Sequence, residues 1–241
     1  MQKAGILAAF AQASAAMGRL QLLLRATALG GAQPAAVLGA LDRACPALTG
    51  TGFATVVYAE YDPAGASLTY ACAGHPPPLL AGEDGVRYLN GGRSGPLGFG
   101  GPHTQATIGV RRGSRLILCT DGLVERRRRS LDAGFGKLAL VAAGLTAGDT
   151  RDACERLLAA MTEGKPSPTM WRWPASTCWA AEPARAGPGY RSSFPGHRCR
   201  CASSTAAQPG SLPGSAWKLS MIWPGLPADS IVCLNIVLAR G

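Results

Sequence analysis

The composition of the chain changes abruptly near residue 165, and this change limits how much of it can form a regular fold. All five tryptophans lie between Trp171 and Trp223, and ten of the 18 prolines follow residue 165. No helical periodicity is recognisable in this part, and one late segment, residues 230–239 (SIVCLNIVLA), has the composition of a strand. We therefore expect an irregular N-terminus at residues 1–12, a folded domain at 13–164 and a poorly ordered tail at 165–241.

Helical periodicity opens and closes the expected domain. Apolar residues recur at helical spacing through residues 13–43, where Gly30-Gly31 interrupts the pattern and Pro34 suits the first turn of a second helix. Two more amphipathic helices are expected at residues 130–145 and 150–164.

Between these helices the sequence has the period of strands. Residues 53–62 (FATVVYAEYD) and 67–75 (SLTYACAGH) flank a Pro-Ala-Gly turn, which predicts a hairpin. A second hairpin is expected about Asp84-Gly85, and two more strands at residues 104–110 and 114–120. The order of helices, strands and helices predicts an α+β fold, an antiparallel sheet covered by helices.

The chain is basic, with a formal net charge of +10. Residues 126–129 are four arginines, and the tail from residue 166 holds seven basic residues against two acidic ones. A basic surface can bind nucleic acid, but no recognisable nucleic-acid motif accompanies this one. We therefore expect no nucleic-acid partner.

The cysteines and the apolar segments of the chain indicate the cellular compartment in which the protein is expected. Cys45, Cys72, Cys119 and Cys154 stand alone in apolar surroundings, which favours free thiols in a reducing, cytoplasmic compartment. No apolar run is long enough to span a bilayer. Residues 4–13 have some likeness to a short signal peptide, an alternative that the sequence leaves open.

A carboxylate follows an apolar strand. Residues 115–119 (RLILC) lead directly into Thr120-Asp121-Gly122. A carboxylate just past a strand end is held by rigid backbone, and the glycine lets a ligand come close. Mg2+ and Mn2+ prefer oxygen ligands of this kind. An ordinary Asp-Gly turn explains the same tripeptide, so both interpretations stay open.

His75 and a glycine-rich loop are two further candidates. His75 lies where an expected strand meets three prolines, and it could act as a general acid or contact a phosphate. Since no carboxylate partner is visible, a structural histidine is the alternative. The loop at residues 91–101 (GGRSGPLGFGG) is a weak nucleotide-binding signal because it lacks the dinucleotide-binding pattern and a Walker lysine.

Taken together, these stretches resemble one family. AGHPPPLL (residues 73–80), GPLGFG (95–100) and LCTDGLVER (118–126) have the order and spacing of the SpoIIE-type branch of the PPM (protein phosphatase 2C-like) family. The resemblance covers about residues 13–164. It implies a β-sandwich flanked by helices and metal-dependent hydrolysis of phosphoserine or phosphothreonine in a protein. The substrate in that family is typically a phosphorylated anti-sigma-factor antagonist.

The resemblance also implies a metal site. In that family two Mn2+ or Mg2+ ions share carboxylates and a bridging water, whose pKa they lower for attack on phosphorus. Asp121 matches one metal ligand, with Gly122 contributing through its backbone, and His75 is the candidate for a catalytic role. The implied partner is a phosphoprotein, no membrane span is expected, and a homodimer is left open.

The sequence departs from the family pattern at the other two metal motifs. The early motif, G-D-V-x-G-H-G, is expected just before Ala13, but no acidic residue precedes Asp42. The late motif, a D-D-V-A-L strand, is expected beyond Gly164, where residues 168–175 read PTMWRWPA. We therefore expect an incomplete fold that is truncated at its N-terminus.

The genetic code connects the late motif with the unusual tail. Read one base earlier, the codons of Met170-Trp171 must encode Val, those of Trp171-Arg172 encode Ala when Arg172 has a CGN codon, and those of residues 168–179 permit DDVALAGVHLL. We expect that the chain is out of frame after about residue 165, through a frameshift or a gene-model error.

Two functions from different classes remain. The chain is a metal-dependent serine/threonine phosphatase, or it is a catalytically dead remnant that serves as a partner-binding module. With one of three carboxylate sites in place, two-metal chemistry should be badly weakened.

Overall fold

A computed structural model of the chain describes residues 2–49, 53–62, 64–111, 113–125, 130–145, 150–162, 216–222 and 230–239. Helices and mainly antiparallel strands make up the described part, which confirms the predicted α+β class. The chain divides into two compact units. The first comprises Met1–Pro77, Leu89–Gly109 and Gln208–Gly241, and the second comprises Pro78–Tyr88 and Val110–Ala207.

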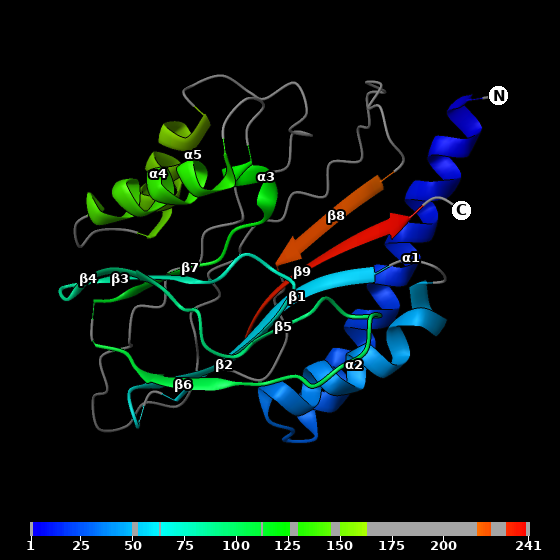
Figure 1. The fold of residues 1–241 in the computed structure, drawn as a ribbon, viewed down its shortest axis with the longest axis horizontal. Coiled ribbons are helices and arrows are strands. Elements are labelled where there is room, and N and C mark those ends of the chain that lie inside the picture. Colours follow the sequence, from blue (N-terminus) through cyan, green and yellow to red (C-terminus); the bar gives the residue numbers. More distant parts are fainter. Residues whose placement is uncertain are drawn as a thin grey trace. The chain divides into compact units, whose positions relative to one another are not determined.

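Two helices, α1 (Gln2–Leu29) and α2 (Pro34–Thr49), belong to the first unit (Figure 1). The predicted break between them is confirmed: Gly31 has a φ of 76°, which glycine adopts without strain, and Pro34 begins α2. Because α1 begins at Gln2, the irregular N-terminus expected at residues 1–12 is corrected. The alanines and leucine of that stretch are strong helix formers.

Among the described residues, the sheet of the first unit has six strands. They are β1 (Phe53–Asp62), β2 (Ser67–Ala73), β5 (Arg93–Ser94), β6 (Ala106–Gly109), β8 (Ala216–Ile222) and β9 (Ser230–Ala239). The strand order is β5-β2-β1-β9-β8, and β6 also pairs with β2. All pairs are antiparallel except β2 with β5.

The predicted first hairpin is confirmed as β1 and β2, which pair from Val56↔Ala73 to Asp62↔Ser67. Alternate residues of β1 share one core with both helices, as the period of a strand with a buried face requires. This core includes Ala54, Val56 and Tyr58 of β1, Leu20 and Leu24 of α1, and Leu38 and Leu41 of α2.

The second unit combines a three-stranded sheet with three helices. Its strands are β3 (Leu79–Gly82), β4 (Gly85–Tyr88) and β7 (Arg115–Ile117), in the order β4-β3-β7, and its helices are α3 (Asp121–Val124), α4 (Leu131–Ala143) and α5 (Thr150–Thr162). The second predicted hairpin is confirmed, with its turn at Glu83-Asp84, one residue earlier than expected. Leu79, Ile117, Leu138 and Leu157 are among the residues of the core.

The two strands expected at residues 104–110 and 114–120 are present as β6 and β7, but they lie in different sheets. β6 pairs with β2 of the first unit, whereas β7 pairs with β3 of the second. The short connection between them therefore links the two units instead of closing a hairpin.

The tail contains more regular structure than the sequence predicted. The strand expected at residues 230–239 is present as β9, which pairs with β1 from Phe53↔Val237 to Glu60↔Ser230. A further strand, β8, was missed. The rest of residues 165–241 lies outside the described residues, so its low order stays a prediction. Across the described part of the chain, no helix has the length and apolar content that a bilayer crossing requires.

Candidate metal ligand and its surroundings

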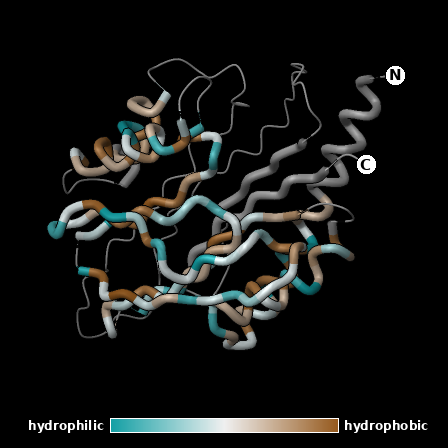
Figure 2. The backbone as a smooth tube through the Cα atoms, viewed as in Figure 1, coloured by the Kyte–Doolittle hydropathy of each residue, from teal (hydrophilic) through white to brown (hydrophobic). Residues whose placement is uncertain are grey.

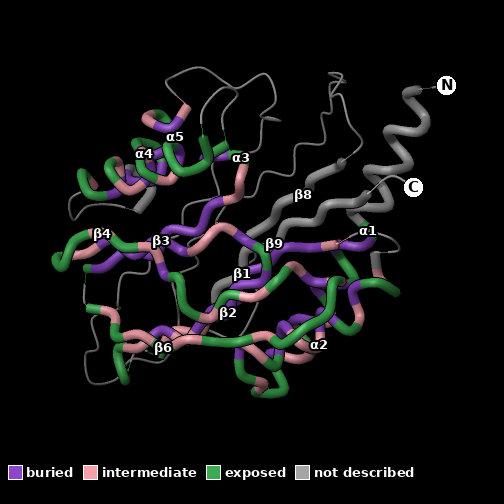
Figure 3. The backbone as a smooth tube through the Cα atoms, viewed as in Figure 1, coloured by how far each residue is buried: buried purple, intermediate pink, exposed green. Residues whose placement is uncertain are grey.

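Asp121 lies at the end of a fully buried stretch. Residues 115–119 are all buried, and Leu116–Cys119 form a hydrophobic run that begins within β7 and leads toward α3 (Figures 2 and 3). Thr120 has extended backbone, and α3 begins at Asp121. The side-chain oxygen Oδ1 of Asp121 accepts a hydrogen bond of 2.8 Å from the backbone N–H of Gly122. The aspartate is half-buried and Gly122 is exposed, so the backbone leaves room for a ligand.

The backbone around Asp121 is held by close packing. Leu123 and Val124 of α3 are buried, and the N–H of Glu125 donates to the Asp121 carbonyl at 2.7 Å. Helix α4 approaches α3 closely at Gly134, because a Cβ at this position would collide with the Val124 carbonyl oxygen. A carboxylate on such a segment is positioned by its supports, as a site residue requires.

The thiol of Cys119, two residues before Asp121, is buried. Burial and, to a lesser extent, the nearby Asp121 charge raise the pKa of this thiol to about 12. Without a metal the thiol therefore stays protonated at neutral pH, and Mn2+ and Mg2+ prefer oxygen ligands to sulfur. Asp121 is left as the carboxylate that the T-D-G segment offers.

Among the described residues, Asp121 is the carboxylate that matches a metal motif of the family, and no complete ligand set accompanies it. Among them, no cluster of three or more His, Cys, Asp or Glu side chains could hold a metal ion. An oxygen-rich set of several ligands is what Mn2+ or Mg2+ requires. The described residues therefore fit a single ligand of the implied metal pair, and they do not fit the pair itself.

His75 lies in the interior of the first unit. Its side chain is 1% exposed, and its Nδ1 lies 3.0 Å from the hydroxyl oxygen of Thr55 on β1. Its carbonyl accepts a hydrogen bond from the Cys72 thiol at 3.2 Å. The adjacent Gly74 has a φ of 61°, and a Cβ there would strike Pro96. These contacts support the structural alternative that the sequence left open.

The glycine-rich loop is attached to both β1 and α2. Leu97 and Ala54 of β1 exchange two backbone hydrogen bonds of 2.8 and 3.2 Å. The ring of Phe99 meets Phe53 edge to face at 5.4 Å. The N–H of Gly98 donates to Oδ1 of Asp42 at 2.6 Å.

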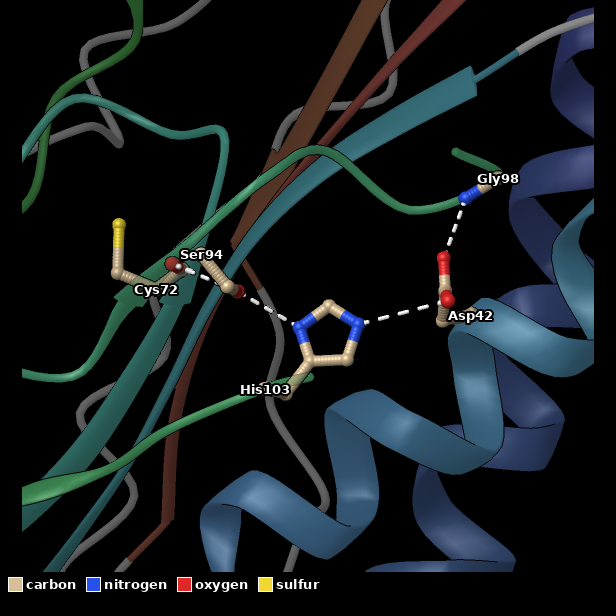
Figure 4. A network of polar contacts seen from close by, with 5 residues as sticks. All are labelled: Asp42, Cys72, Ser94, Gly98 and His103. Carbon is tan, nitrogen blue, oxygen red and sulfur yellow. Dashed lines mark hydrogen bonds and ion pairs between the residues drawn. The ribbon is translucent and has the colours of Figure 1, made fainter. Parts of the chain in front are cut away.

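Sequence reasoning missed a polar network beside this loop. Ser94, His103 and Asp42 are connected by side-chain contacts (Figure 4). The available signal was Asp42 itself, a carboxylate between Leu41 and Cys45 on the buried face of α2. An ionisable group on such a face is rarely left unpaired.

The predicted site residues do not all belong to one unit. Asp121 and Gly122 are in the second unit, whereas His75 and the glycine-rich loop are in the first. Their arrangement around a common cleft therefore stays a prediction.

Comparisons with known proteins identify the family. The family model of Stage II sporulation protein E (SpoIIE) matches residues 11–169, which is more than half of the chain. A crystal structure of RsbU and RsbW domains from Mycobacterium tuberculosis is similar in fold, with a TM-score of 0.58 at 22% identity. This match covers 96% of the present chain and 50% of the other.

Two more solved structures have lower similarity. The SiaA-PP2C domain of Pseudomonas aeruginosa matches with a TM-score of 0.47 at 21% identity, covering 60% of each chain. The phosphatase domain of SpoIIE from Bacillus subtilis matches with a TM-score of 0.41 at 15% identity, covering 61% of this chain and 65% of that one. The present chain thus spans between half and two thirds of the length of these proteins. On the family match, the chain belongs to the SpoIIE family.

Proposed function

We propose that this chain is a phosphoprotein phosphatase domain of the metal-dependent type, acting on phosphoserine or phosphothreonine. The observation that carries the proposal is the position of Asp121, a half-buried carboxylate directly after a buried strand, within the segment that the SpoIIE family model matches. When bound, Mn2+ or Mg2+ would activate a water and neutralise charge on the phosphoryl group. Asp121 would contribute one ligand, and Gly122 would allow close approach through its backbone.

The finer features of this proposal follow from the family. The substrate would be a phosphorylated protein, with an anti-sigma-factor antagonist as its class, and a homodimer is compatible with the family. Cys45, Cys72, Cys119 and Cys154 are buried thiols outside any disulfide, which supports a reducing compartment such as the cytoplasm. We also retain the domain limits at residues 13–164, with an out-of-frame tail after about residue 165.

A second function is favoured by the incomplete ligand set. One carboxylate cannot hold two metal ions, so the chain as it stands would be a weak enzyme or a non-catalytic module that binds the same partner. The two functions make the same prediction for the fold and different predictions for turnover.

Binding of Mn2+ itself tests the assignment of Asp121. Paramagnetic Mn2+ broadens NMR signals of nearby atoms, so we expect the Gly122 and Leu123 amides to broaden first as the ion is added. Asp121→Asn should remove this broadening. Asp132→Asn, which changes an exposed carboxylate at the start of α4, is the matched control and should leave it intact. Unchanged broadening in Asp121→Asn would show that the ion binds elsewhere.

A further inference from the structure

We propose that Asp42, Ser94 and His103 form a protonation-dependent clasp that fastens the glycine-rich loop to α2. The three residues come from α2, from β5 and from the segment before β6. All of them belong to the first unit, so the proposal does not depend on how the two units are placed. It is also independent of the phosphatase activity.

The clasp is a continuous chain of short contacts (Figure 4). Nδ1 of His103 lies 2.6 Å from the Ser94 hydroxyl, which lies 3.4 Å from the Cys72 carbonyl oxygen of β2. On the other side of the ring, Nε2 lies 3.6 Å from Oδ2 of Asp42. The other oxygen of Asp42 accepts from the Gly98 N–H at 2.6 Å. The chain of contacts therefore joins β2, the loop and α2.

Burial makes these contacts sensitive to charge. The side chains of His103 and Asp42 are 4% and 8% exposed. Nε2 of His103 is buried and has no hydrogen-bond partner, although the Asp42 carboxylate is within ion-pair distance. Coulomb interactions of buried groups are screened much less than those of exposed groups. The protonation state of one ring is therefore expected to matter for the whole chain of contacts.

A count of hydrogen-bond donors shows which protonation state of His103 allows all contacts of the clasp to form. The Ser94 hydroxyl has one proton, which it can donate either to His103 Nδ1 or to the Cys72 carbonyl. A neutral ring that accepts at Nδ1 takes this proton from the Cys72 carbonyl, and a neutral ring that donates at Nδ1 turns the lone pair of Nε2 toward the Asp42 carboxylate. With a protonated ring, Nδ1–H donates to Ser94, Ser94 donates to Cys72, and Nε2–H faces the Asp42 carboxylate. Protonation thus satisfies every partner and turns the 3.6 Å contact into an ion pair.

The surroundings offer no competing charge among the described residues. The elements that pack here carry the titratable groups Asp42, Arg43 and Cys45 on α2, the buried Tyr70 and Cys72 on β2, and Arg93 on β5. Arg43 and Arg93 are exposed, and the Cys72 thiol donates to the His75 carbonyl. Asp42 is the charged group paired with His103.

A neighbouring contact without a titratable group supplies the control. The side-chain oxygen of Gln105 accepts from the N–H of Ala35 in the first turn of α2 at 3.0 Å. Loss of this bond should loosen the segment after the loop equally at every pH. Loss of the clasp should instead remove a dependence on pH.

The wild-type chain provides the first test by NMR. Ring nitrogen shifts of His103 and the exchange rate of the Gly98 amide would be followed between about pH 5.5 and 8, the range in which histidine ordinarily titrates. After correction for intrinsic exchange, Gly98 should be about fivefold better protected when His103 is protonated, as expected for an ion pair of modest strength. The protection of the Gly98 amide should change over the same pH interval as the ring nitrogen shifts of His103. Gly98 protection that stays constant while the His103 ring titrates would overturn the proposal.

Variants provide the second test. In His103→Gln and Asp42→Asn the protection of Gly98 should no longer depend on pH, whereas in Gln105→Ala the dependence should persist at a lower overall protection. A pH dependence in His103→Gln that equals that of the wild type would also overturn the proposal.

Discussion

The segment that the SpoIIE family model matches and the segment beyond it acquire their structure in different ways. Within residues 11–169, the hairpin of β1 and β2 forms between strands that adjoin in the sequence. Beyond residue 169, β9 pairs with the opposite edge of β1, which lies far away in the sequence. Pairing over a long separation costs more loop entropy and depends on sequence outside the strands. Local sequence pattern therefore predicts the strand pairing of the first segment, and it does not predict that of the second.

The largest effect should come from the packing of the second unit. Gly134→Ala places a Cβ against the Val124 carbonyl, so we expect the free energy of unfolding to fall by about 3 kcal/mol. Gly136→Ala, on the same helix with open space around it, should instead raise it by up to about 1 kcal/mol, because alanine favours helices. Urea unfolding of both variants measures the difference. Equal effects would show that α3 and α4 are not in close contact.

Removal of β8 and β9 tests how much the segment beyond residue 169 stabilises the sheet. A chain that ends at residue 215 lacks β8 and β9, and the backbone groups of β1 that face β9, in alternate residues between Phe53 and Glu60, lose their partners. We expect a loss of about 2 kcal/mol, which for a chain of this size lowers Tm by roughly 4–8 °C. Calorimetry of the two chains measures it. An unchanged Tm would mean that β9 does not stabilise the sheet.

The edge of β1 that pairs with β9 tests the proposed change of reading frame. A frame restored at residue 168 replaces the sequences of β8 and β9, so β1 then needs another partner on that edge. We expect the restored D-D-V-A-L segment to take this place. The amides of Thr55 and Val57 face β9, because the Ala54 amide faces the other side of β1, where it bonds Leu97. Their hydrogen exchange in the restored protein should be as slow as in the present chain if the D-D-V-A-L segment pairs with β1, and faster if this edge is open.

Two buried thiols predict a loss of stability at high pH. Burial raises the pKa of Cys72 to about 11 and that of Cys119 to about 12, from an ordinary value of 9.0. Above about pH 9 the unfolded chain loses these protons while the folded chain keeps them, so stability falls as pH rises through the interval between the ordinary and the raised pKa. Each thiol contributes a slope of at most about 1.4 kcal/mol per pH unit.

Urea unfolding between pH 8 and 10.5 measures this slope. Cys119→Ala should flatten it relative to the wild type. A slope that is the same in both proteins would assign the alkaline loss to other groups.

The smallest effect concerns the hairpin turn. Ala66 has a φ of 45°, an unfavourable value for a residue with a Cβ. Ala66→Gly should therefore raise the free energy of unfolding by up to about 1 kcal/mol. Ala64→Gly in the same turn is the control and should not raise it. If both variants destabilise equally, Ala66 does not hold the left-handed conformation.

The sequence was sufficient for the elements that local pattern defines. The β1–β2 hairpin follows from two β-branched and aromatic runs around a tight turn, and Asp121 was expected at the end of a buried strand because apolar residues lead directly into T-D-G. Both features depend on residues that adjoin in the sequence.

Features that join distant segments were missed for the same reason. Asp42 and His103 come from a helix and a loop about sixty residues apart, and no spacing rule connects them. Strand β8 (AWKLSMI) lies in a stretch of irregular composition and depends on β9 for its pairing. The expected irregularity of residues 1–12 gave too little weight to the helix propensity of alanine.

The central claim is that this chain descends from a metal-dependent phosphatase and lacks carboxylates that the reaction needs. The most direct measurement is Mn2+-dependent phosphate release from one phosphoserine protein. It compares the present chain with a version that carries the early G-D-V-x-G-H-G motif and the in-frame D-D-V-A-L strand. We predict that the restored version is active and that the present chain is at least about a thousandfold slower, because the electrostatic stabilisation of the phosphoryl group is lost with the metals. Comparable rates, or an inactive restored version, would contradict the account.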